Sequence, residues 1–419
     1  MTDPAPPVAD RTRRARWPYL IGLLVIAIVS FLCGARWGGA LLGRAKGLRP
    51  NRPPGPARLD ATTRPAGAAA SQASPPASTR PGVRPPLPGE FERQSALIVG
   101  CNELVRLHPR VFVQIVSAAW RTVRLIGLVS TEQEHRLGRE LLRRHDIPAR
   151  AMLFVRMPLD SMWTRDYGPI FARRADGSPV AVDLLYRPTK AEADRLRDAG
   201  AAGLLGRAMG VPVESVRIEM EGGNLVTNGE GFCVTTHWLT HRNKRRGLDK
   251  GAIGQLLRRH FGARGWMGVV PLTGEPSGHA DMMLTFLAPN VAVVGRLDAA
   301  AEADNAAILD KVASLLTGRP TSRGPMQVHR IPMPTARDGV WLSYTNVIFA
   351  NGVLLVPTFS SVDSSTQAEA LGLYARLMPD WRIVGINADS LAPQRGLLHC
   401  LVCNVPPYVD VERLVRNAR

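Results

Sequence analysis

Hydrophobic and polar positions divide the chain into three regions. Residues 19 to 35 form an apolar run without a charge, residues 37 to 88 contain almost no aromatic or β-branched side chains, and after residue 89 short apolar runs alternate with amphipathic segments. Only the last region has the pattern of a folded domain, because buried strands and amphipathic helices leave runs of these two kinds. We therefore predict a mixed α/β domain over residues 89 to 419.

Short apolar runs of this domain predict β-strands, and longer segments with apolar residues on one face predict helices. The predicted strands are Ser95 to Val99, Arg121 to Leu128, Met152 to Arg156, Ile170 to Arg173, Phe232 to Thr236, Met282 to Phe286, Val291 to Gly295, Val353 to Val356 and Leu397 to Cys403. The predicted helices are Thr131 to His145, Ala191 to Met209, Leu248 to Phe261, Ala300 to Leu316 and Ser364 to Met378. Strand-strand-helix-strand units recur loosely, without an exact sequence repeat.

The first apolar run predicts a membrane anchor over residues 18 to 36, behind a basic tail at residues 1 to 17. Its length approaches what a helix needs to cross a bilayer. A cleaved signal peptide is the alternative, because arginines precede the run, but no convincing small-x-small cleavage site follows it. Basic residues flank the run on both sides, so the positive-inside rule does not decide the orientation. Of the two sides of the membrane, we favour the extracytoplasmic side for the domain.

Residues 37 to 88 are expected to form a disordered linker rich in Pro, Ala and Arg, since they cannot build a core. The first 88 residues carry +10 of the formal net charge of +18. This charge suits anionic lipid headgroups better than nucleic acid, because no aromatic side chains are interleaved for base stacking. We interpret a second basic run, His241 to Arg246, as a solvated loop. The expected partners are a membrane and a substrate, with no nucleic acid; the sequence leaves the oligomeric state open.

Polar residues cluster in four segments that follow predicted strands or lie in the loops after them. These are Trp163 to Pro169, Glu221 to Asn224, Gly278 to Asp281 and the pair His399-Cys400. A rigid scaffold can present such loops in one cleft, where they supply a thiol, an imidazole and three carboxylates. This set suits attack on a cationic carbon, and a guanidinium group fits best.

Cys400 is the candidate nucleophile. A buried core thiol, half of a disulfide and a metal ligand are the alternatives. Cys400 and Cys403 have C-x-x-C spacing, but they lie in an apolar β-like run and do not open a helix. Residues three apart on a strand face opposite sides, so Cys403 should point away. The other cysteines are scattered, which disfavours zinc. We expect a reactive thiol without a metal or a cofactor.

Asp166 and Asp281 are the candidate ligands of the guanidinium. Two carboxylates can approach its planar fork of N–H donors from different sides. A salt bridge to Arg165 is the alternative role of Asp166. His279 and Asp281, two residues apart on an extended segment, are expected to point into the same cleft.

These motifs, together with Ser343 to Asn346 and Ala350 to Gly352, have the order and approximate spacing of one enzyme family. Over about residues 89 to 407 the chain resembles the family of agmatine deiminases and bacterial-type (Porphyromonas-type) peptidylarginine deiminases. The resemblance implies a pentein fold, with five strand-strand-helix-strand modules around a pseudo-fivefold axis and the active site in the central channel. It also implies a cofactor-free hydrolase of guanidino groups.

The resemblance assigns roles to individual residues. Cys400 attacks the guanidinium carbon, and His279 is the general acid and base, oriented by Glu221. Water then hydrolyses the thiouronium intermediate to a ureido product. Asn346 and Trp163 are further candidate substrate contacts, with packing as the alternative for each. An amidinotransferase of the same superfamily and a tethered, non-catalytic guanidinium-binding protein are the alternative functions.

The segment before the nucleophile departs from the family pattern. Agmatine deiminases usually have a Gly-Gly-Gly-Asn loop ahead of Ile-His-Cys, whereas this chain has Pro-Gln-Arg-Gly-Leu-Leu over residues 393 to 398. Arg395 would repel the distal ammonium of agmatine and attract a carboxylate. The substrate is therefore agmatine or free or peptidyl arginine, with the arginine compounds favoured by Arg395.

Overall fold

The protein is described by a computed structural model over residues 83 to 187 and 195 to 417. The chain divides into two units, Met1–Ser74 and Pro75–Arg419, and the described residues belong to the second. The first contacts of the domain come shortly before the predicted boundary at residue 89. Arg84 pairs with Glu214 at 2.6 Å, and the backbone N–H of Leu87 donates to Phe261 at 3.2 Å.

Several sequence predictions concern the N-terminal part of the chain. The basic tail at residues 1 to 17, the membrane anchor at residues 18 to 36 and most of the linker at residues 37 to 88 lie outside the described residues. Within the described ranges, no helix is long and apolar enough to cross a bilayer.

Five sheets with a common pairing pattern form the framework of the described residues. In each, one strand pairs antiparallel with its first neighbour and parallel with the next. Their strands are β18 (Val402–Val405), β1 (Ala96–Gly100), β2 (Arg124–Val129) and β3 (Leu153–Arg156); β4 (Ile170–Arg173), β5 (Pro179–Leu185) and β6 (Val213–Glu219); β7 (Val226–Thr227), β8 (Phe232–Thr236) and β9 (Gly265–Val269); β10 (Leu284–Ala288), β11 (Val291–Arg296) and β14 (Gln327–Pro332); β15 (Ile348–Phe349), β16 (Val353–Thr358) and β17 (Arg382–Asn387). A small ribbon pairs β12 (Pro320–Thr321) with β13 (Gly324–Pro325).

The last strand closes onto the first. β18 pairs antiparallel with β1, with Ala96 opposite Val405 and Val99 opposite Val402. Every residue of β1 is buried, as expected for a strand with a parallel partner and packing on both faces. Because β18 directly follows Cys400, this pairing anchors the nucleophile segment in the framework.

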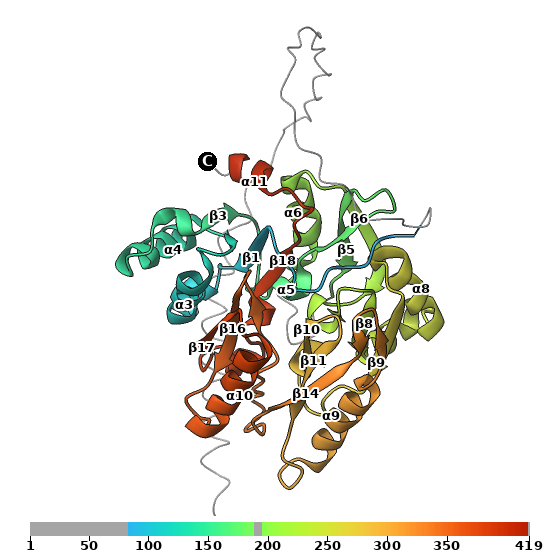
Figure 1. Ribbon diagram of the computed structural model, residues 1–419. Coiled ribbons are helices and arrows are strands. Elements are labelled where there is room, and N and C mark those ends of the chain that lie inside the picture. The colour runs from blue at the N-terminus through green and yellow to red at the C-terminus, as the bar shows by residue number, and fades with distance from the viewer. Residues whose placement is uncertain (1–82, 188–194, 418–419) are drawn as a thin grey trace, which may run out of the picture. The chain divides into compact units, whose positions relative to one another are not determined.

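Helices cover the outer sides of the sheets (Figure 1). The α-helices of the described residues are α2 (Leu104–Leu107), α3 (Pro109–Ala119), α4 (Glu132–Arg144), α5 (Thr164–Tyr167), α6 (Ala201–Met209), α7 (Trp238–Asn243), α8 (Lys250–Phe261), α9 (Ala303–Leu316), α10 (Ser364–Leu377) and α11 (Glu412–Asn417). Of these, the short α5 is not an outer helix, because it lies among the sheets beside β18. Local chemistry sets the ends of the helices. A capping box between Thr131 and Glu134 starts α4, Asp249 caps α8 through the Ala252 N–H, and Gly262 ends α8 with φ of +64°.

Short 3₁₀ turns carry several of the polar motifs. They are η1 (Ala149–Ala151), η3 (Asp198–Gly200), η4 (Gly222–Asn224), η5 (Lys244–Arg246), η6 (Ala280–Met282), η7 (Ala392–Gln394) and η8 (His399–Leu401). Most of the predicted strands and helices occur within a few residues of their expected ranges. The predicted strand Leu397 to Cys403 is wrong in its first half, where η8 precedes β18. Of the predicted helix Ala191 to Met209, only Ala201–Met209 is an α-helix in the described residues.

Candidate active site

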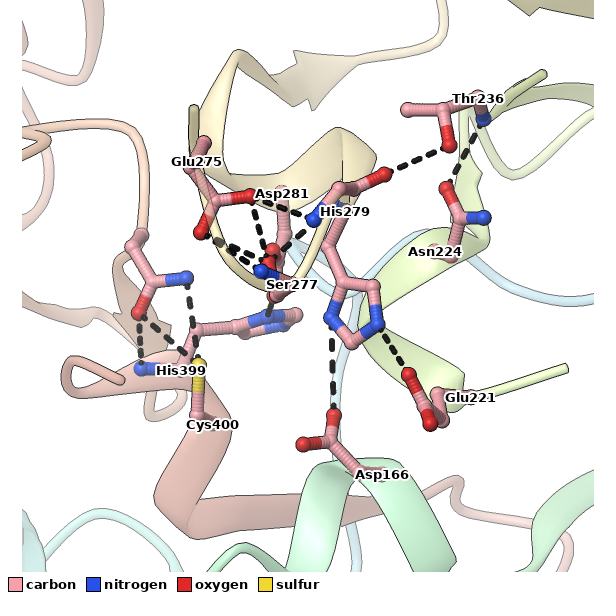
Figure 2. A network of polar contacts seen from close by, with 12 residues as sticks. Asp166, Glu221, Asn224, Thr236, Glu275, Ser277, His279, Asp281, His399 and Cys400 are labelled. Carbon is pink, nitrogen blue, oxygen red and sulfur yellow. Dashed lines mark hydrogen bonds and ion pairs between the residues drawn. The ribbon is translucent and has the colours of Figure 1, made fainter. Parts of the chain in front are cut away.

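Side chains from several turns meet at one cavity of about 60 Å³. Figure 2 shows the network of polar contacts to which several of these side chains belong. The lining of the cavity comprises Trp163, Asp166, Tyr186, Arg195, Glu221, Arg242, Pro276, Ser277, His279, Gln394, Arg395 and Cys400. A larger open groove of about 1120 Å³, between Arg296 and Asp389, has none of these side chains in its wall. The chemistry predicted from the sequence therefore belongs to the smaller cavity.

The ring of His279 lies between two carboxylates. Nε2 is 2.6 Å from Glu221 Oε2, and Nδ1 is 3.7 Å from Asp166 Oδ1 (Figure 2). Burial disfavours the charged ring, but the hydrogen bond to Glu221 and the charges of Asp166 and Asp281 outweigh it and raise the pKa of His279. Arg242 donates to the other oxygen of Glu221 at 2.8 Å. His279 is therefore an imidazolium at neutral pH and can act as a proton donor in the cavity.

Gly223 packs directly against the acidic and basic groups. A Cβ atom at this position would lie 2.7 Å from His279 Nδ1, 2.9 Å from Asp281 Oδ2 and 3.4 Å from Asp166 Oδ1. The three polar atoms thus converge on one point of the backbone, which only a residue without a side chain allows. Gly222 serves a different close approach, since a Cβ atom there would lie 2.3 Å from the carbonyl oxygen of Arg165.

A buried carboxylate shapes the loop that leads to His279. Glu275 accepts hydrogen bonds from the Gly278 backbone at 2.6 Å and from the Ser277 hydroxyl at 2.8 Å (Figure 2). Gly278 has φ of +64°, and a Cβ atom there would lie 1.7 Å from the ring of Trp238. Only glycine fits this turn, and the turn sets the position of the backbone of the next residue, His279.

Cys400 lies in η8, where it is 6% exposed at the cavity wall. Asn346 holds this turn: its Oδ1 accepts from the backbone N–H of His399 at 2.8 Å, and its Nδ2 lies 3.7 Å from Cys400 Sγ. Burial, reinforced by the charges of Asp281 and Asp166, raises the pKa of Cys400 well above its ordinary value. The thiol is neutral at rest and needs a nearby cation to ionise.

Asp281 has one bonded and one open carboxylate oxygen. Its Oδ2 lies 2.7 Å from His399 Nδ1, and its backbone carbonyl accepts from the Thr345 hydroxyl at 2.9 Å. Its Oδ1 is buried and has no hydrogen-bond partner among the described residues. Leaving a buried carboxylate oxygen unpaired costs free energy, so this position suits an N–H donor from outside the chain.

The other candidate residues differ in their relation to the cavity. Trp163 lines it, is 4% exposed and packs against Gly396. Arg395 also lines it, with an exposed side chain and a left-handed φ of +65°. Asn346 is fully buried and holds the nucleophile turn without lining the cavity. Asn224 accepts from the backbone of Thr236 at 2.8 Å and so supports the wall.

Two local expectations are wrong. Cys400 does not lie on a strand, because β18 begins only at Val402. His279 and Asp281 do not alternate along a strand either, since Asp281 lies in a 3₁₀ turn. Each residue has a different partner: His279 bonds to Glu221, whereas Asp281 bonds to the ring of His399. Cys403 contacts the carbonyl of Pro169 at 3.2 Å, and both it and Cys400 are free thiols.

Sequence reasoning does not single out Glu90, Arg242 or Glu275. The run His241 to Arg246 is not a loop: it continues α7 into η5, and Arg242 is only 19% exposed as it pairs with Glu221. A single carboxylate or arginine carries no local signal for such contacts. Within the described ranges, no group of three or more His, Cys, Asp or Glu side chains is arranged to hold a metal ion.

Comparison with known proteins adds to this geometry. The sequence profile of the Porphyromonas-type peptidyl-arginine deiminase family matches residues 87–406. An agmatine deiminase of Pseudomonas putida is 25% identical over 286 residues, covering 60% of this chain and 76% of the relative. A Porphyromonas gingivalis structure assigned as an arginine deiminase has a TM-score of 0.66 at 25% identity, covering 77% of this chain and 98% of that one. For the agmatine deiminase of Enterococcus faecalis, the TM-score is 0.66 at 21% identity, with 80% and 100% covered, which is a similarity of fold.

Proposed function

Because the chain belongs to the Porphyromonas-type peptidyl-arginine deiminase family, we propose that it hydrolyses a guanidino group to a ureido group and ammonia. One observation carries this proposal. The thiol of Cys400 and the ring of His279 line the same small cavity as the carboxylate of Asp166. Asp281 is not in this lining, but its Oδ2 meets His279 Nδ1 and Asp166 Oδ1 at the Cβ position of Gly223. A nucleophile, a proton donor and two cation ligands are what the reaction needs.

The two carboxylates bind the substrate. A guanidinium presents five N–H donors in a planar fork, so Asp166 and Asp281 can each accept from a different side. Asp281 Oδ1 gains a donor that no described residue supplies. Trp163 covers the apolar stem that joins the guanidinium to the rest of the substrate.

Substrate binding activates the nucleophile. In the empty site, burial and the two carboxylates raise the pKa of Cys400. A bound guanidinium neutralises the carboxylates and places a positive charge beside the sulfur, which lowers the pKa of the thiol again. The thiolate therefore forms when its target carbon is present.

Chemistry then proceeds in two steps. The thiolate of Cys400 attacks the guanidinium carbon, and the C–N bond breaks as His279 gives its proton to the departing ammonia. His279, now neutral, removes a proton from a water molecule that attacks the thiouronium carbon. The resulting tetrahedral adduct collapses: the C–S bond breaks and the proton of its hydroxyl group passes to the sulfur, which releases the ureido product and restores the neutral thiol of Cys400. Glu221 keeps the ring oriented through both steps.

Charge at the cavity favours a substrate with a carboxylate or a neutral amide at its distal end. Arg195, Arg242 and Arg395 all line the cavity, so the second ammonium of agmatine would meet like charges. Free arginine offsets its α-ammonium with a carboxylate that these arginines can attract, and an internal peptidyl arginine has neutral amides there. The agmatine deiminases among the relatives make agmatine the alternative substrate.

Two further features complete the proposal. The recurrent pairing of the five sheets, with β18 closing onto β1, supports a pseudo-fivefold pentein arrangement around the site. The apolar run at residues 19 to 35 supports a membrane anchor over residues 18 to 36. We propose the extracytoplasmic side for the catalytic domain, although the charges that flank the run do not select a side. Fractionation and protease protection of the full-length protein in cells would test the second feature.

A substrate panel tests the function. The full-length protein is incubated with agmatine, free arginine and an arginine peptide, and ammonia and ureido product are measured in a buffer without amines. Equal amounts of the two products from at least one substrate are expected. Transfer that depends on an added amine would instead identify an amidinotransferase. Guanidinium binding without any product would indicate a non-catalytic binding protein.

A further inference from the structure

The ring of His399, next to the nucleophile in the chain, is bonded at both nitrogens. Nδ1 lies 2.7 Å from Asp281 Oδ2, and Nε2 lies 2.7 Å from Glu90 Oε2. A neutral imidazole has a single N–H and can donate to only one of these oxygens. Both contacts are hydrogen bonds when the ring is doubly protonated. His399 is therefore held as a cation between two carboxylates.

The second carboxylate extends the contact to another element. Glu90 Oε1 lies 2.8 Å from the guanidinium of Arg165, which also donates to the side chain of Asn404. The contacts therefore form a row of alternating charge, in the order Asp281, His399, Glu90 and Arg165. His399 lies between two carboxylates, and Glu90 lies between two cations. Burial and Arg165 oppose the charge of His399, but Glu90 and Asp281 outweigh them and raise its pKa.

Glu90 comes from the segment that leads into the domain. We call residues 87 to 94 the N-terminal strap. It is tied down at both ends, by the Leu87 N–H to Phe261 and by the Gln94 N–H to Asn351 Oδ1 at 2.8 Å. The strap contributes no group to the lining of the catalytic cavity. It nevertheless supplies a direct partner of the residue that holds Asp281.

We propose, on the premise of the deiminase function above, that His399 and Glu90 are positioning residues for the guanidinium site. His399 holds Oδ2 of Asp281, which leaves Oδ1 open for an N–H of the substrate. Glu90 holds the opposite ring nitrogen, so the imidazole can neither rotate nor present a bare nitrogen to Asp281. Neither residue takes part in bond breaking or exchanges a proton with the substrate.

The proposal is tested by the rate at which two reagents alkylate Cys400. Chloroacetamidine is cationic and resembles a guanidinium, whereas chloroacetamide has a similar shape and no charge. The ratio of the two rates measures how well the carboxylates hold a cation. It cancels changes in the thiol itself, and it does not require turnover.

We expect the parent protein to favour the cationic reagent. His399→Leu removes the donor to Asp281 and should lower the ratio by about tenfold to a hundredfold, the usual effect of losing a hydrogen bond to a charged group. His399→Asn can place an N–H where Nδ1 stood, and it should recover most of the ratio. Glu90→Ala should lower the ratio by a smaller factor, and Glu90→Gln should retain more of it.

Glu92→Ala is the matched control, because Glu92 lies in the same strap but its side chain accepts only from the Gly89 N–H in the described contacts, at 2.7 Å. It should keep the parental ratio. A parental ratio in both His399→Leu and Glu90→Ala would overturn the positioning role and leave the deiminase function standing. Even if His399→Leu fails to fold, Glu90→Ala decides the question. A parent without preference for the cation would overturn the proposed function.

Discussion

The close approach of Gly223 to the acidic and basic groups predicts a specific catalytic defect. Gly223→Ala would place a Cβ atom 2.7 Å from His279 Nδ1 and 2.9 Å from Asp281 Oδ2. Its φ is not in the left-handed region, so alanine can adopt the backbone conformation. The substitution therefore acts on the neighbouring side chains and leaves the backbone unstrained.

The size of the effect follows from these distances. Because ordinary carbon contacts begin near 3.4 Å, the ring nitrogen must move by about 0.7 Å and the carboxylate oxygen by about 0.5 Å. Neither can yield freely, since Glu221 holds His279 at 2.6 Å and His399 holds Asp281 at 2.7 Å. Catalytic groups tolerate errors of about 0.5 Å, and about 1 Å can cost ~10²-fold. We expect kcat/KM to fall by about tenfold to a hundredfold, or ~1.4 to ~2.7 kcal/mol.

The assay measures ureido product under steady-state conditions, alongside the thermal unfolding midpoint. Gly200→Ala is the matched control, because Gly200 also lies in a 3₁₀ turn and an added Cβ would meet nothing within 4 Å. Overpacking should also cost Gly223→Ala about 1 to 3 kcal/mol of stability, which leaves the protein folded at room temperature. A folded Gly223→Ala variant with the same kcat/KM as Gly200→Ala would refute the convergence of these groups on the turn.

The other predictions concern single residues and the N-terminal segment. Cys400→Ser and His279→Ala should each lower kcat by at least ~10³-fold. The unfolding midpoint should stay unchanged in Cys400→Ser and fall in His279→Ala, which removes the buried partner of Glu221; near-parental turnover in Cys400→Ser would disprove covalent catalysis. Arg395→Gly should raise kcat/KM for agmatine relative to kcat/KM for arginine compounds; if the ratio of these two values is unchanged, Arg395 does not contact the substrate. The same substitution relieves a φ of +65° and should raise the free energy of unfolding by about 1 kcal/mol. Burial alone would raise the pKa of Glu90, but the neighbouring cations Arg165 and His399 lower this pKa from 4.5 to about 2. The ionised carboxylate therefore stabilises the fold above pH 4.5, and this stabilisation is lost as the pH falls toward 2. Glu90→Gln should therefore show a smaller decrease of the urea midpoint between about pH 5 and about pH 3 than the parent, and equal decreases would contradict this. Deleting residues 1 to 82 should leave kcat/KM unchanged, because no proposed site residue lies there; a large loss would place part of the site in that segment.

Residue chemistry predicts the site better than it predicts local conformation. Cys400, His279, Glu221, Asp166 and Asp281 stand out because few other functions would use a thiol, an imidazole and carboxylates in this combination. Their segments also lie at the ends of apolar runs, which the sequence reveals well. The type of side chain and the position relative to strands therefore predict that these segments share one cleft, and the resemblance to the deiminase family supplies the role of each residue.

Local conformation around the nucleophile depends on contacts that no local pattern encodes. The run Leu397 to Cys403 is apolar throughout except for His399, and it predicts a strand. The structure bends it into a 3₁₀ turn because Asn346, which is 53 residues away, accepts a hydrogen bond from the His399 backbone. Glu90 and His399 are 309 residues apart in the chain, so their contact is likewise invisible in the sequence.

Strands with mixed polarity are among the elements that the sequence pattern does not predict, as are the helix α3 and the strand β5. β6 (Val213–Glu219) places glutamate, serine and arginine between its apolar residues and is half-exposed. β9 (Gly265–Val269) contains two glycines, which lower strand propensity. Both are stabilised by parallel pairing with a buried neighbouring strand, β5 and β8 respectively. Tertiary pairing of this kind overrides local propensity.

The most direct test of the account is the site of labelling by chloroacetamidine in the full-length protein. Intact mass and peptide mapping are followed together with residual activity, with and without arginine substrate. We predict one equivalent of label on Cys400, a loss of activity in proportion to the label, and protection by the substrate. Label on Cys33, Cys101, Cys233 or Cys403 in its place, or full activity after Cys400 is completely labelled, would contradict the central role of this thiol.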